Sequence, residues 1–262
     1  RAVQPGGDQV VLLTSSGDRY HHLAFNLLSL PDGRIQKITN LTTSQMEPDS
    51  GAAPGDTSIE AVRAIADEPS YAWSPDEKKL AFIGVLDGPT AELYLYNFAT
   101  KKITRVSQDD AQNYWPSWSP DGRHILIFGA DNFGSGAGYS MQGAWSANGD
   151  GSNVTWLYAP SRSGEELIGW RDNQTAILDS WNPGCGSAEL RLYNIVSAQK
   201  TIIQEGCFGS AAVGNWTDSQ TNTVMFNKDD GLYLLPADGD VPQKHSSNQV
   251  ESIQWDRAGS MF

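Results

Sequence analysis

A tryptophan followed by a polar turn and an apolar strand recurs along the whole chain. The clearest copy is the run WSPDG from Trp118 to Gly122, which precedes the strand-forming segment Arg123 to Phe128. Proline presets φ for the first central position of a tight turn, and glycine leaves the turn without a Cβ clash. Related segments begin at Trp73, Trp170, Trp216 and Trp255, at intervals of 45, 52, 46 and 39 residues. This spacing is typical of a β-propeller built from four-stranded blades.

The repeat predicts an all-β chain that forms a single β-propeller domain over residues 1–262, with five four-stranded blades. Blade 1 takes residues 8–42 and 251–262, blade 2 residues 69–107, blade 3 residues 114–160, blade 4 residues 166–205 and blade 5 residues 212–247. Residues 8–42 hold only three strands, Gln9 to Thr14, Leu23 to Leu30 and Arg34 to Thr39. We therefore expect the C-terminal strand around Trp255 to complete blade 1 and close the ring, which would remove exposed sheet edges.

Residues 43–68 form the longest connection between the predicted blades. They are acidic and rich in Gly, Pro and Ser, and the stretch Ser58 to Asp67 has apolar residues at near-helical spacing. The sequence therefore predicts a loop that carries one short helix.

The charge of the chain limits the partners that it can have. Its formal net charge is −13, and its few cations are scattered, so nucleic acid and anionic membrane surfaces would be repelled. No run approaches the roughly 18 apolar residues needed to cross a bilayer. We expect no nucleic-acid partner and no direct membrane insertion of this segment. The opening residues lack the pattern of a signal peptide, so we expect any such leader or lipid anchor to have been removed from this numbering.

The two cysteines, Cys185 and Cys207, flank a predicted hairpin with strands at about Ala188 to Asn194 and Lys200 to Glu205. Folding this hairpin at Ser197-Ala198 brings both cysteines to the same edge of a blade, within reach of a disulfide. A pair of buried thiols is the alternative, whereas a zinc site lacks further ligands nearby. The disulfide indicates an oxidising, extracytoplasmic location: periplasmic, secreted or on the exterior of a membrane-tethered protein.

The motif WSPDG, followed by an apolar strand and a later LYxxxxDG turn, resembles the WD40-like repeat of TolB-type β-propellers. It is also similar to the propeller domains of prolyl oligopeptidase relatives. The resemblance covers nearly the whole chain. It is strongest at Trp73 to Asp76 and Trp118 to Gly122, and weaker where Arg171 and Thr217 replace the motif proline. It implies a propeller that binds proteins or gates access to another domain, with the motif itself serving structure. TolB has six blades and an additional N-terminal domain, and neither is found in this sequence.

Catalytic and metal-binding patterns are absent from the sequence. It contains no G-x-S-x-G, H-E-x-x-H, P-loop or C-x-x-C motif. His21 and His22 are adjacent, which points them to opposite sides of an extended segment. The acidic pairs Asp109-Asp110 and Asp229-Asp230 are typical of solvated loops. We therefore predict no catalytic residues, no metal and no cofactor.

Aromatic and amide side chains are expected to converge on one face of the propeller. Loops between the second and third strands of a blade emerge on the same face as the connections between blades, around the mouth of the channel. The predicted binding residues there are Tyr20, His21, His22, Tyr114, Trp115, Asn132, Phe133, Tyr139, Trp181 and Asn182. Exposed aromatic residues with amides nearby suit a protein anchor or a sugar. Alternatively, Trp115 and Trp181 pack over the ends of the sheets.

These features favour a non-catalytic, extracytoplasmic binding or scaffold propeller that engages a protein or a cell-envelope component through its loop-rich face. One alternative is a carbohydrate-binding or glycoside-hydrolysing propeller, because some five-bladed propellers cleave furanosides. Another is the propeller domain of a longer peptidase.

Overall fold

The computed structural model describes residues 2–4, 6–14, 23–41, 70–87, 90–108, 111–131, 140–158, 165–182, 184, 186–209, 211–213, 223–237, 239 and 241–248. The chain divides into two compact units, Arg1–Ala159 and Pro160–Phe262, and each is described by itself. Throughout these described stretches the regular secondary structure is β-strand, which confirms the predicted all-β class.

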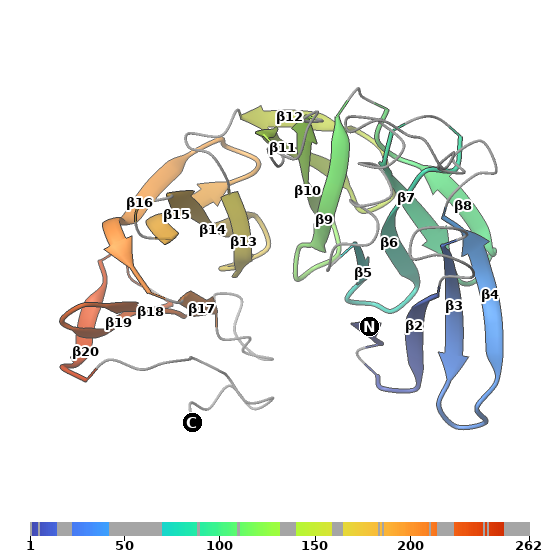
Figure 1. Ribbon diagram of the computed structural model, residues 1–262, viewed down its shortest axis with the longest axis horizontal. Helices are drawn as coiled ribbons and strands as arrows, with labels where there is room; N and C mark the ends of the chain where they lie inside the picture. The colour runs from blue at the N-terminus through green and yellow to red at the C-terminus, as the bar shows by residue number, and fades with distance from the viewer. Residues whose placement is uncertain are drawn as a thin grey trace. The chain divides into compact units, whose positions relative to one another are not determined.

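Unit 1 contains three four-stranded antiparallel sheets (Figure 1). Blade 1 consists of β1 (Ala2–Val3), β2 (Gln9–Thr14), β3 (Ala24–Ser29) and β4 (Ile35–Asn40). Blade 2 consists of β5 (Tyr71–Trp73), β6 (Lys79–Gly84), β7 (Glu92–Asn97) and β8 (Lys102–Arg105). Blade 3 consists of β9 (Gln112–Trp118), β10 (His124–Asp131), β11 (Ser140–Asn148) and β12 (Thr155–Tyr158).

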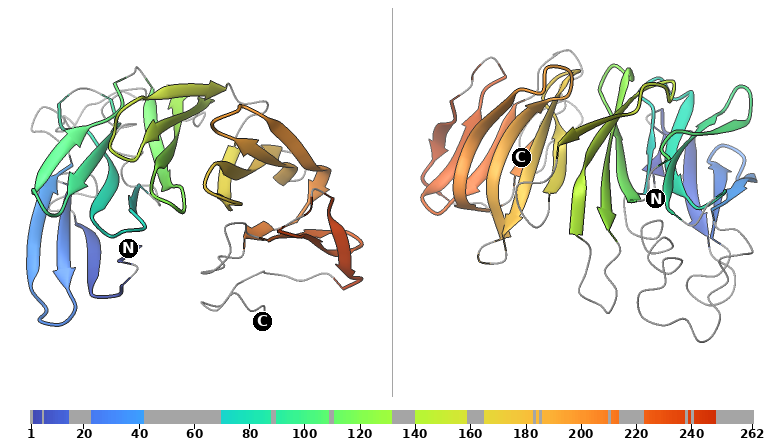
Figure 2. Two further views of the ribbon diagram at one scale, coloured as in Figure 1. Left: turned by 180° about the vertical axis from the view of Figure 1, so that it is seen from behind. Right: turned by 90° about the horizontal axis from the view of Figure 1, so that it is seen from above.

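Unit 2 contains two further sheets with the same strand order (Figure 2). Blade 4 consists of β13 (Glu165–Trp170), β14 (Thr175–Asn182), β15 (Gly186–Asn194) and β16 (Lys200–Phe208). Blade 5 consists of β17 (Ala211–Val213), β18 (Val224–Lys228), β19 (Gly231–Leu235) and β20 (Gln243–Ser246). The hairpin predicted around Ser197-Ala198 is confirmed as β15 and β16, and Ala198 turns the chain with a positive φ of 58°.

The repeated Ser-Pro-Asp turn has the same hydrogen bonds in blades 2 and 3. In blade 3, Ser119 Oγ donates to Asp121 Oδ1 at 2.7 Å and accepts from the amide of His124 at 3.0 Å. In blade 2, Ser74 makes the equivalent bonds with Asp76 and Lys79. Serine and aspartate thus fix the turn from within, which explains why these residue types recur.

Residues 8–42 hold three strands, as expected, but the first strand of blade 1 is β1, which precedes them in the chain and takes the place expected for the C-terminal strand. β1 pairs antiparallel with β2, with Val3 opposite Val10. The amide of Gln4 donates to Gln9 O and that of Gly7 to Gln4 O, both at 2.8 Å, which repeats the backbone pattern of the Ser-Pro-Asp turns. The segment QPGG from Gln4 to Gly7 is therefore a degenerate copy of the motif. Residues 251–262, which were expected to fill this place, lie outside the described part of the chain, so ring closure stays a prediction.

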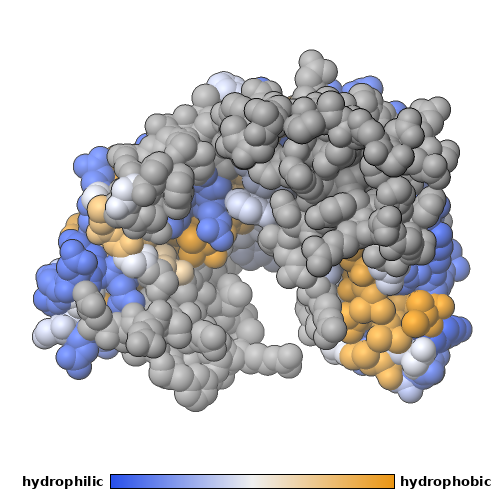
Figure 3. Space-filling model, in the orientation of Figure 1, coloured by the Kyte–Doolittle hydropathy of each residue, from blue (hydrophilic) through white to orange (hydrophobic). Residues whose placement is uncertain are grey.

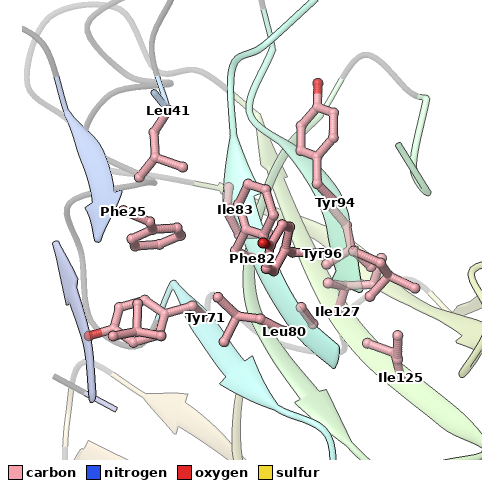
Figure 4. Close-up of a cluster of buried hydrophobic side chains, with 14 of the residues drawn as sticks. Phe25, Leu41, Tyr71, Leu80, Phe82, Ile83, Tyr94, Tyr96, Ile125 and Ile127 are labelled. Atoms are coloured by element: carbon pink, nitrogen blue, oxygen red, sulfur yellow. The ribbon is translucent and has the colours of Figure 1, made fainter. Parts of the chain in front are cut away.

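The core of unit 1 lies between the faces of its blades. Phe25 of blade 1 packs edge-on against Tyr71 and Phe82 of blade 2, with ring centroids 4.9 and 5.4 Å apart, and Ile125 of blade 3 joins the same cluster (Figure 4). The opposite face of blade 1 is more exposed. There the register aligns Val10, Leu28 and Ile35, and apolar surface is visible over this sheet (Figure 3).

Side chains of one blade also bond to the backbone of the next within each unit. In unit 1, Lys79 Nζ of blade 2 donates to Gly149 O of blade 3 at 2.6 Å, and Trp118 Nε1 donates back to Ala72 O at 3.0 Å. In unit 2, the Arg171 guanidinium of blade 4 donates to carbonyls of the β19–β20 turn of blade 5, including that of Gly239. Arg171, which replaces a motif residue, therefore keeps a structural role.

Candidate functional site

The aromatic pair Tyr114 and Trp115 lies in β9, the first strand of blade 3 and one edge of its sheet. Both side chains are half-buried, and their ring centroids are 4.8 Å apart at an interplanar angle of 81°. Both also pack against Phe128 of β10, with centroids at 6.1 and 6.4 Å. The sequence placed this pair in a loop, which was wrong, because the residues are part of a strand that continues to Trp118.

Trp115 has an unusual backbone conformation for a large side chain. Its φ is 52°, in the left-handed region that favours glycine. The register between β9 and β10 shifts at this point: Tyr114 faces Phe128, but Ser117 already faces Leu126. The bulge turns Trp115 out of the regular alternation of the strand. Strained backbone of this kind persists where surrounding structure enforces it and is often found at binding sites.

The other predicted binding residues are not brought together by the described structure. Tyr20, His21, His22, Asn132, Phe133 and Tyr139 lie outside the described residues. Trp181 and Asn182 are the last two residues of β14. The predicted convergence of these residues around a channel mouth therefore stays a prediction.

A buried carboxylate, which the sequence analysis missed, organises the end of blade 2 next to β9. Glu92 is 0% exposed, and its Oε1 accepts from Arg105 Nη2 at 2.9 Å and from Thr90 Oγ1 at 2.7 Å. Its Oε2 accepts from Ser107 Oγ at 2.5 Å, and Asn113 Nδ2 of β9 lies 3.4 Å away. The carboxylate thus has charged and neutral donors on both oxygens, as a buried charge requires.

Arg105 also links this carboxylate to the segment before β7. Its Nη1 bonds to Asp87 Oδ1 at 3.1 Å, and the hydroxyl of Tyr94 donates to the same aspartate oxygen. Burial, followed by the hydrogen bond to Asp87, raises the pKa of Tyr94. Tyr94 therefore stays a neutral donor at any physiological pH.

Blade 4 has a second buried carboxylate cluster at the equivalent position of its third strand. Arg191 of β15 bonds to Glu165 of β13 through Nη2 and to Glu189 through Nη1, the latter at 3.0 Å. Lys200 Nζ adds a contact of 2.9 Å to Glu189. Burial alone would raise the pKa of Glu189, but hydrogen bonds from Lys200 and Arg191 outweigh it and lower the pKa. Glu189 is therefore ionised at neutral pH.

A sequence signal for both clusters does exist. The third strands of blades 2 and 4 read AELYLYN and AELRLYN, so Glu92 and Glu189 occupy the same repeat position. A glutamate followed by alternating leucines in a predicted central strand is unexpected unless a cation pairs with it. In blade 2 the ion pair of Glu92 and Arg105 joins the neighbouring strands β7 and β8, and in blade 4 that of Glu165 and Arg191 joins β13 to β15 across β14.

One of the two cysteines of the predicted disulfide lies in the described part of blade 4. Cys207 lies in β16 and is not a free thiol, whereas Cys185 lies outside the described residues. β15 and β16 are in register at Ser187 and Phe208, next to the two cysteine positions in sequence. The pairing of Cys185 with Cys207 stays a prediction.

Reduction of the purified protein tests this pairing. A bridge that closes a loop of about 20 residues stabilises the fold mainly by restricting the unfolded chain, so reduction should lower the melting temperature by a few degrees. Thiol titration of the unfolded protein should give no free thiol before reduction and two afterwards. Two free thiols before reduction would contradict the bridge.

The described residues hold no group of three or more His, Cys, Asp or Glu side chains placed to bind a metal ion. In the same stretches, we find no helix with the length and hydropathy needed to span a membrane.

Comparisons with known proteins give partial matches in sequence. No protein-family model matches the chain. The Tol-Pal system protein TolB of Alcanivorax borkumensis is 38% identical over 58 residues, which are 22% of this chain and 13% of that protein. TolB of Ruthia magnifica subsp. Calyptogena magnifica is 25% identical over 117 residues, 42% of this chain and 27% of that protein. The chain thus matches well under half the length of these relatives.

Solved structures support the fold. An oligogalacturonate lyase in complex with manganese matches 99% of this chain and 68% of its own at a TM-score of 0.65 and 11% identity. The β-propeller domain of the Trilobed protease from Pyrococcus furiosus matches 87% of this chain and 66% of its own, at a TM-score of 0.54 and 14% identity. At such identities the likeness concerns the fold alone. The four-stranded antiparallel sheets and these structural matches together identify the fold as a β-propeller, and parts of its sequence are similar to TolB proteins.

Proposed function

We propose that this protein is a non-catalytic binding propeller that engages a protein or another cell-envelope component outside the cytoplasm. The observation that carries the proposal is the Tyr114–Trp115 pair. Its rings are half-exposed on β9, the first strand of blade 3, and a bulge with positive φ holds Trp115 out of the strand's alternation. Large aromatic side chains that are held rigidly contribute most to protein recognition, because little conformational entropy is lost on binding.

The chemistry around the pair is suited to binding. Asn113, the preceding residue, is buried and donates to Ala91 O at 3.2 Å, and Gln112 accepts from the amide of Ala91 at 2.7 Å. These bonds tie β9 to blade 2, so the strand that presents the rings is fixed on both sides. A preorganised surface of this kind favours binding.

The relatives and the cysteine chemistry support the rest of the proposal. Two sequence relatives are named Tol-Pal system proteins TolB, so a protein partner in such a system is the first candidate for this chain. The negative formal charge of −13 favours partners with a basic surface. The predicted disulfide between Cys185 and Cys207 is consistent with a periplasmic or other extracytoplasmic location.

Trp115→Ala is expected to weaken partner binding about tenfold or more. An aromatic side chain that becomes buried in an interface typically contributes more than about 1.4 kcal/mol to the binding free energy. The measurement is retention of envelope-extract proteins and of arrayed glycans by the immobilised wild type and variant. Trp115→Phe, which keeps an aromatic ring over Phe128, should retain part of the affinity.

The matched control is Ile35→Ala, which removes another exposed apolar side chain of unit 1, 61% exposed on β4. It should leave binding unchanged. Thermal melts of all three variants identify any loss caused by unfolding. If immobilised Trp115→Ala retains the same proteins as the wild type, the Tyr114–Trp115 pair has no role in partner binding. Retention of glycans alone would favour the carbohydrate-binding alternative.

A further inference from the structure

The regular pairing of β9 with β10 is interrupted where the aromatic pair lies. After the aligned residues Tyr114 and Phe128, β9 has one residue more than β10 before the two strands are aligned again at Ser117. Trp115 lies in this bulge with a φ of 52°. Because a bulge takes its extra residue out of the regular ladder, the backbone on either side of it sets the direction of the ring. The position of the Tyr114–Trp115 pair therefore depends on how β9 is anchored just before the bulge.

The anchor before the bulge is the peptide backbone of Ala91, the residue that precedes β7 in blade 2. Ala91 O accepts from the amide of Asn113 at 2.8 Å and from Asn113 Nδ2 at 3.2 Å. The amide of Ala91 donates to Gln112 Oε1 at 2.7 Å. All three residues are buried, where such bonds are stronger than in water. Ala91 thus uses both of its backbone polar groups to hold the two residues directly before Tyr114.

The Glu92 carboxylate in turn fixes Ala91. Thr90 and Glu92 flank this alanine, and Thr90 Oγ1 donates to Glu92 Oε1 at 2.7 Å, which closes a short loop around it. On the other carboxylate oxygen, Ser107 Oγ donates at 2.5 Å and accepts from the amide of Leu93 at 2.7 Å. The backbone on both sides of Ala91 is therefore held by bonds that converge on one buried carboxylate.

Blade 4 has a glutamate at the same repeat position but uses it differently. Glu189 pairs with Arg191 and Lys200, which both belong to blade 4. β17, the first strand of the following blade, has the sequence AAV and no side-chain amide, whereas β9 begins with Gln112 and Asn113. Among the described strands, a buried glutamate next to an anchor for the following blade thus occurs where the aromatic pair lies.

We propose that Glu92 is a positioning residue for the Tyr114–Trp115 pair. It acts through Ala91, and a direct contact of 3.4 Å joins Glu92 Oε2 to Asn113 Nδ2. Loss of the charge loosens this anchor and lets the rings take more than one orientation. Partner affinity then falls, because only part of the population is competent to bind. The effect on affinity rests on the proposed function, whereas the effect on the rings does not.

Fluorine NMR of protein labelled with 5-fluorotryptophan tests the proposal without any partner. Trp115→Phe assigns the Trp115 resonance by its disappearance. Glu92→Gln is compared with Glu189→Gln, which removes the same charge at the same repeat position of blade 4. Both are measured at a temperature at which circular dichroism shows them to be folded. We expect the Trp115 resonance to shift by more than its linewidth, or to split, in Glu92→Gln and to keep its position in Glu189→Gln.

Thr90→Val is the second variant, and it serves if Glu92→Gln does not fold. Valine has nearly the shape of threonine but lacks the hydroxyl that donates to Glu92, so a smaller change of the Trp115 resonance in the same direction is expected. Thr90→Ser keeps the hydroxyl and should give the resonance of the wild type.

Retention of envelope-extract proteins by the immobilised variants is the second measurement. Glu92→Gln should lower retention about threefold or more, and Glu189→Gln should leave it unchanged. An unchanged Trp115 resonance in Glu92→Gln and Thr90→Val overturns the proposal. Equal changes in Glu92→Gln and Glu189→Gln also overturn it, since they indicate a general effect of losing a buried charge. If the resonance changes as expected but retention does not, Glu92 positions the pair and the proposed binding role of the pair fails.

Discussion

Arg191→Met is expected to lower the free energy of unfolding of the unit that contains it by about 3–5 kcal/mol. The Arg191 side chain is 3% exposed, and its guanidinium is the shared partner of Glu165 and Glu189, whose side chains are 0% and 6% exposed. Methionine fills similar space but leaves two carboxylates buried without this cation, and removing one partner of a buried ion pair typically has an effect of this size. Urea denaturation at pH 7, followed by circular dichroism, measures the change.

The pH dependence separates this explanation from a loss of packing. The lowered pKa of Glu189 means that its ion pairs stabilise the wild type above the unfolded value of 4.5, and that this contribution is lost as pH falls through the lower folded value. In Arg191→Met the Glu189 carboxylate loses one of the hydrogen bonds that lower its pKa, so the difference from the wild type should be largest at pH 7 and shrink toward pH 4. A difference that does not change between these pH values would indicate lost packing alone.

Lys200→Met is the matched control for this prediction. The Lys200 side chain is 37% exposed, and Glu189 keeps its bond to Arg191 when the lysine is removed. Ion pairs with an exposed partner contribute little, so we expect a loss of less than about 1 kcal/mol. A loss equal to that of Arg191→Met would contradict the central position of Arg191.

Glu92→Gln is expected to destabilise unit 1 by about 3 kcal/mol, although the two side chains have nearly the same shape. The change removes the charge that Arg105 faces and places an NH₂ group among the donors Thr90, Ser107 and Asn113. Buried donors that face each other lose their hydrogen bonds and keep the desolvation penalty. Equilibrium unfolding in urea gives the magnitude.

Two comparisons make this test specific. Asp87→Asn keeps an oxygen that can accept from Tyr94 and removes a partly exposed charge, so a loss of less than about 1 kcal/mol is expected. The double variant Glu92→Gln with Arg105→Met should be less destabilised than the sum of the single variants, because the arginine no longer lacks its partner. Strict additivity would show that the two residues do not interact.

The regular parts of the fold were predictable because their determinants are local. The turn between Trp118 and His124 is fixed by the hydrogen bonds of Ser119 and Asp121, so its residue types are sufficient to identify it. The strand pair around Ser197-Ala198 was found from alternating apolar residues and a turn signal. The same approach missed β1, because Val3 replaces the motif tryptophan and Gln4 to Gly7 forms the turn without serine or aspartate.

The candidate site was less predictable, because it depends on register and burial. Trp115 was correctly recognised as lying outside the repeat position, but its place in β9 follows from a one-residue shift against β10 that the sequence does not show. Glu92 and Glu189 were missed because buried glutamates read as surface residues in a strand. Only the positions of Arg105 and Arg191 explain how these charges are buried.

The hydrogen bonds between blades affect how the sequence of such a chain can diverge in evolution. Lys79, Trp118 and Arg171 each reach across to a main-chain carbonyl of the adjacent blade, and every residue type supplies that acceptor. A blade can therefore diverge in sequence without losing its bond to its neighbour, provided that its turn keeps the same backbone path. Duplication of single repeats followed by sequence divergence is tolerated under this arrangement, which accounts for a blade such as blade 1 that keeps the four-stranded sheet although Val3 replaces the motif tryptophan.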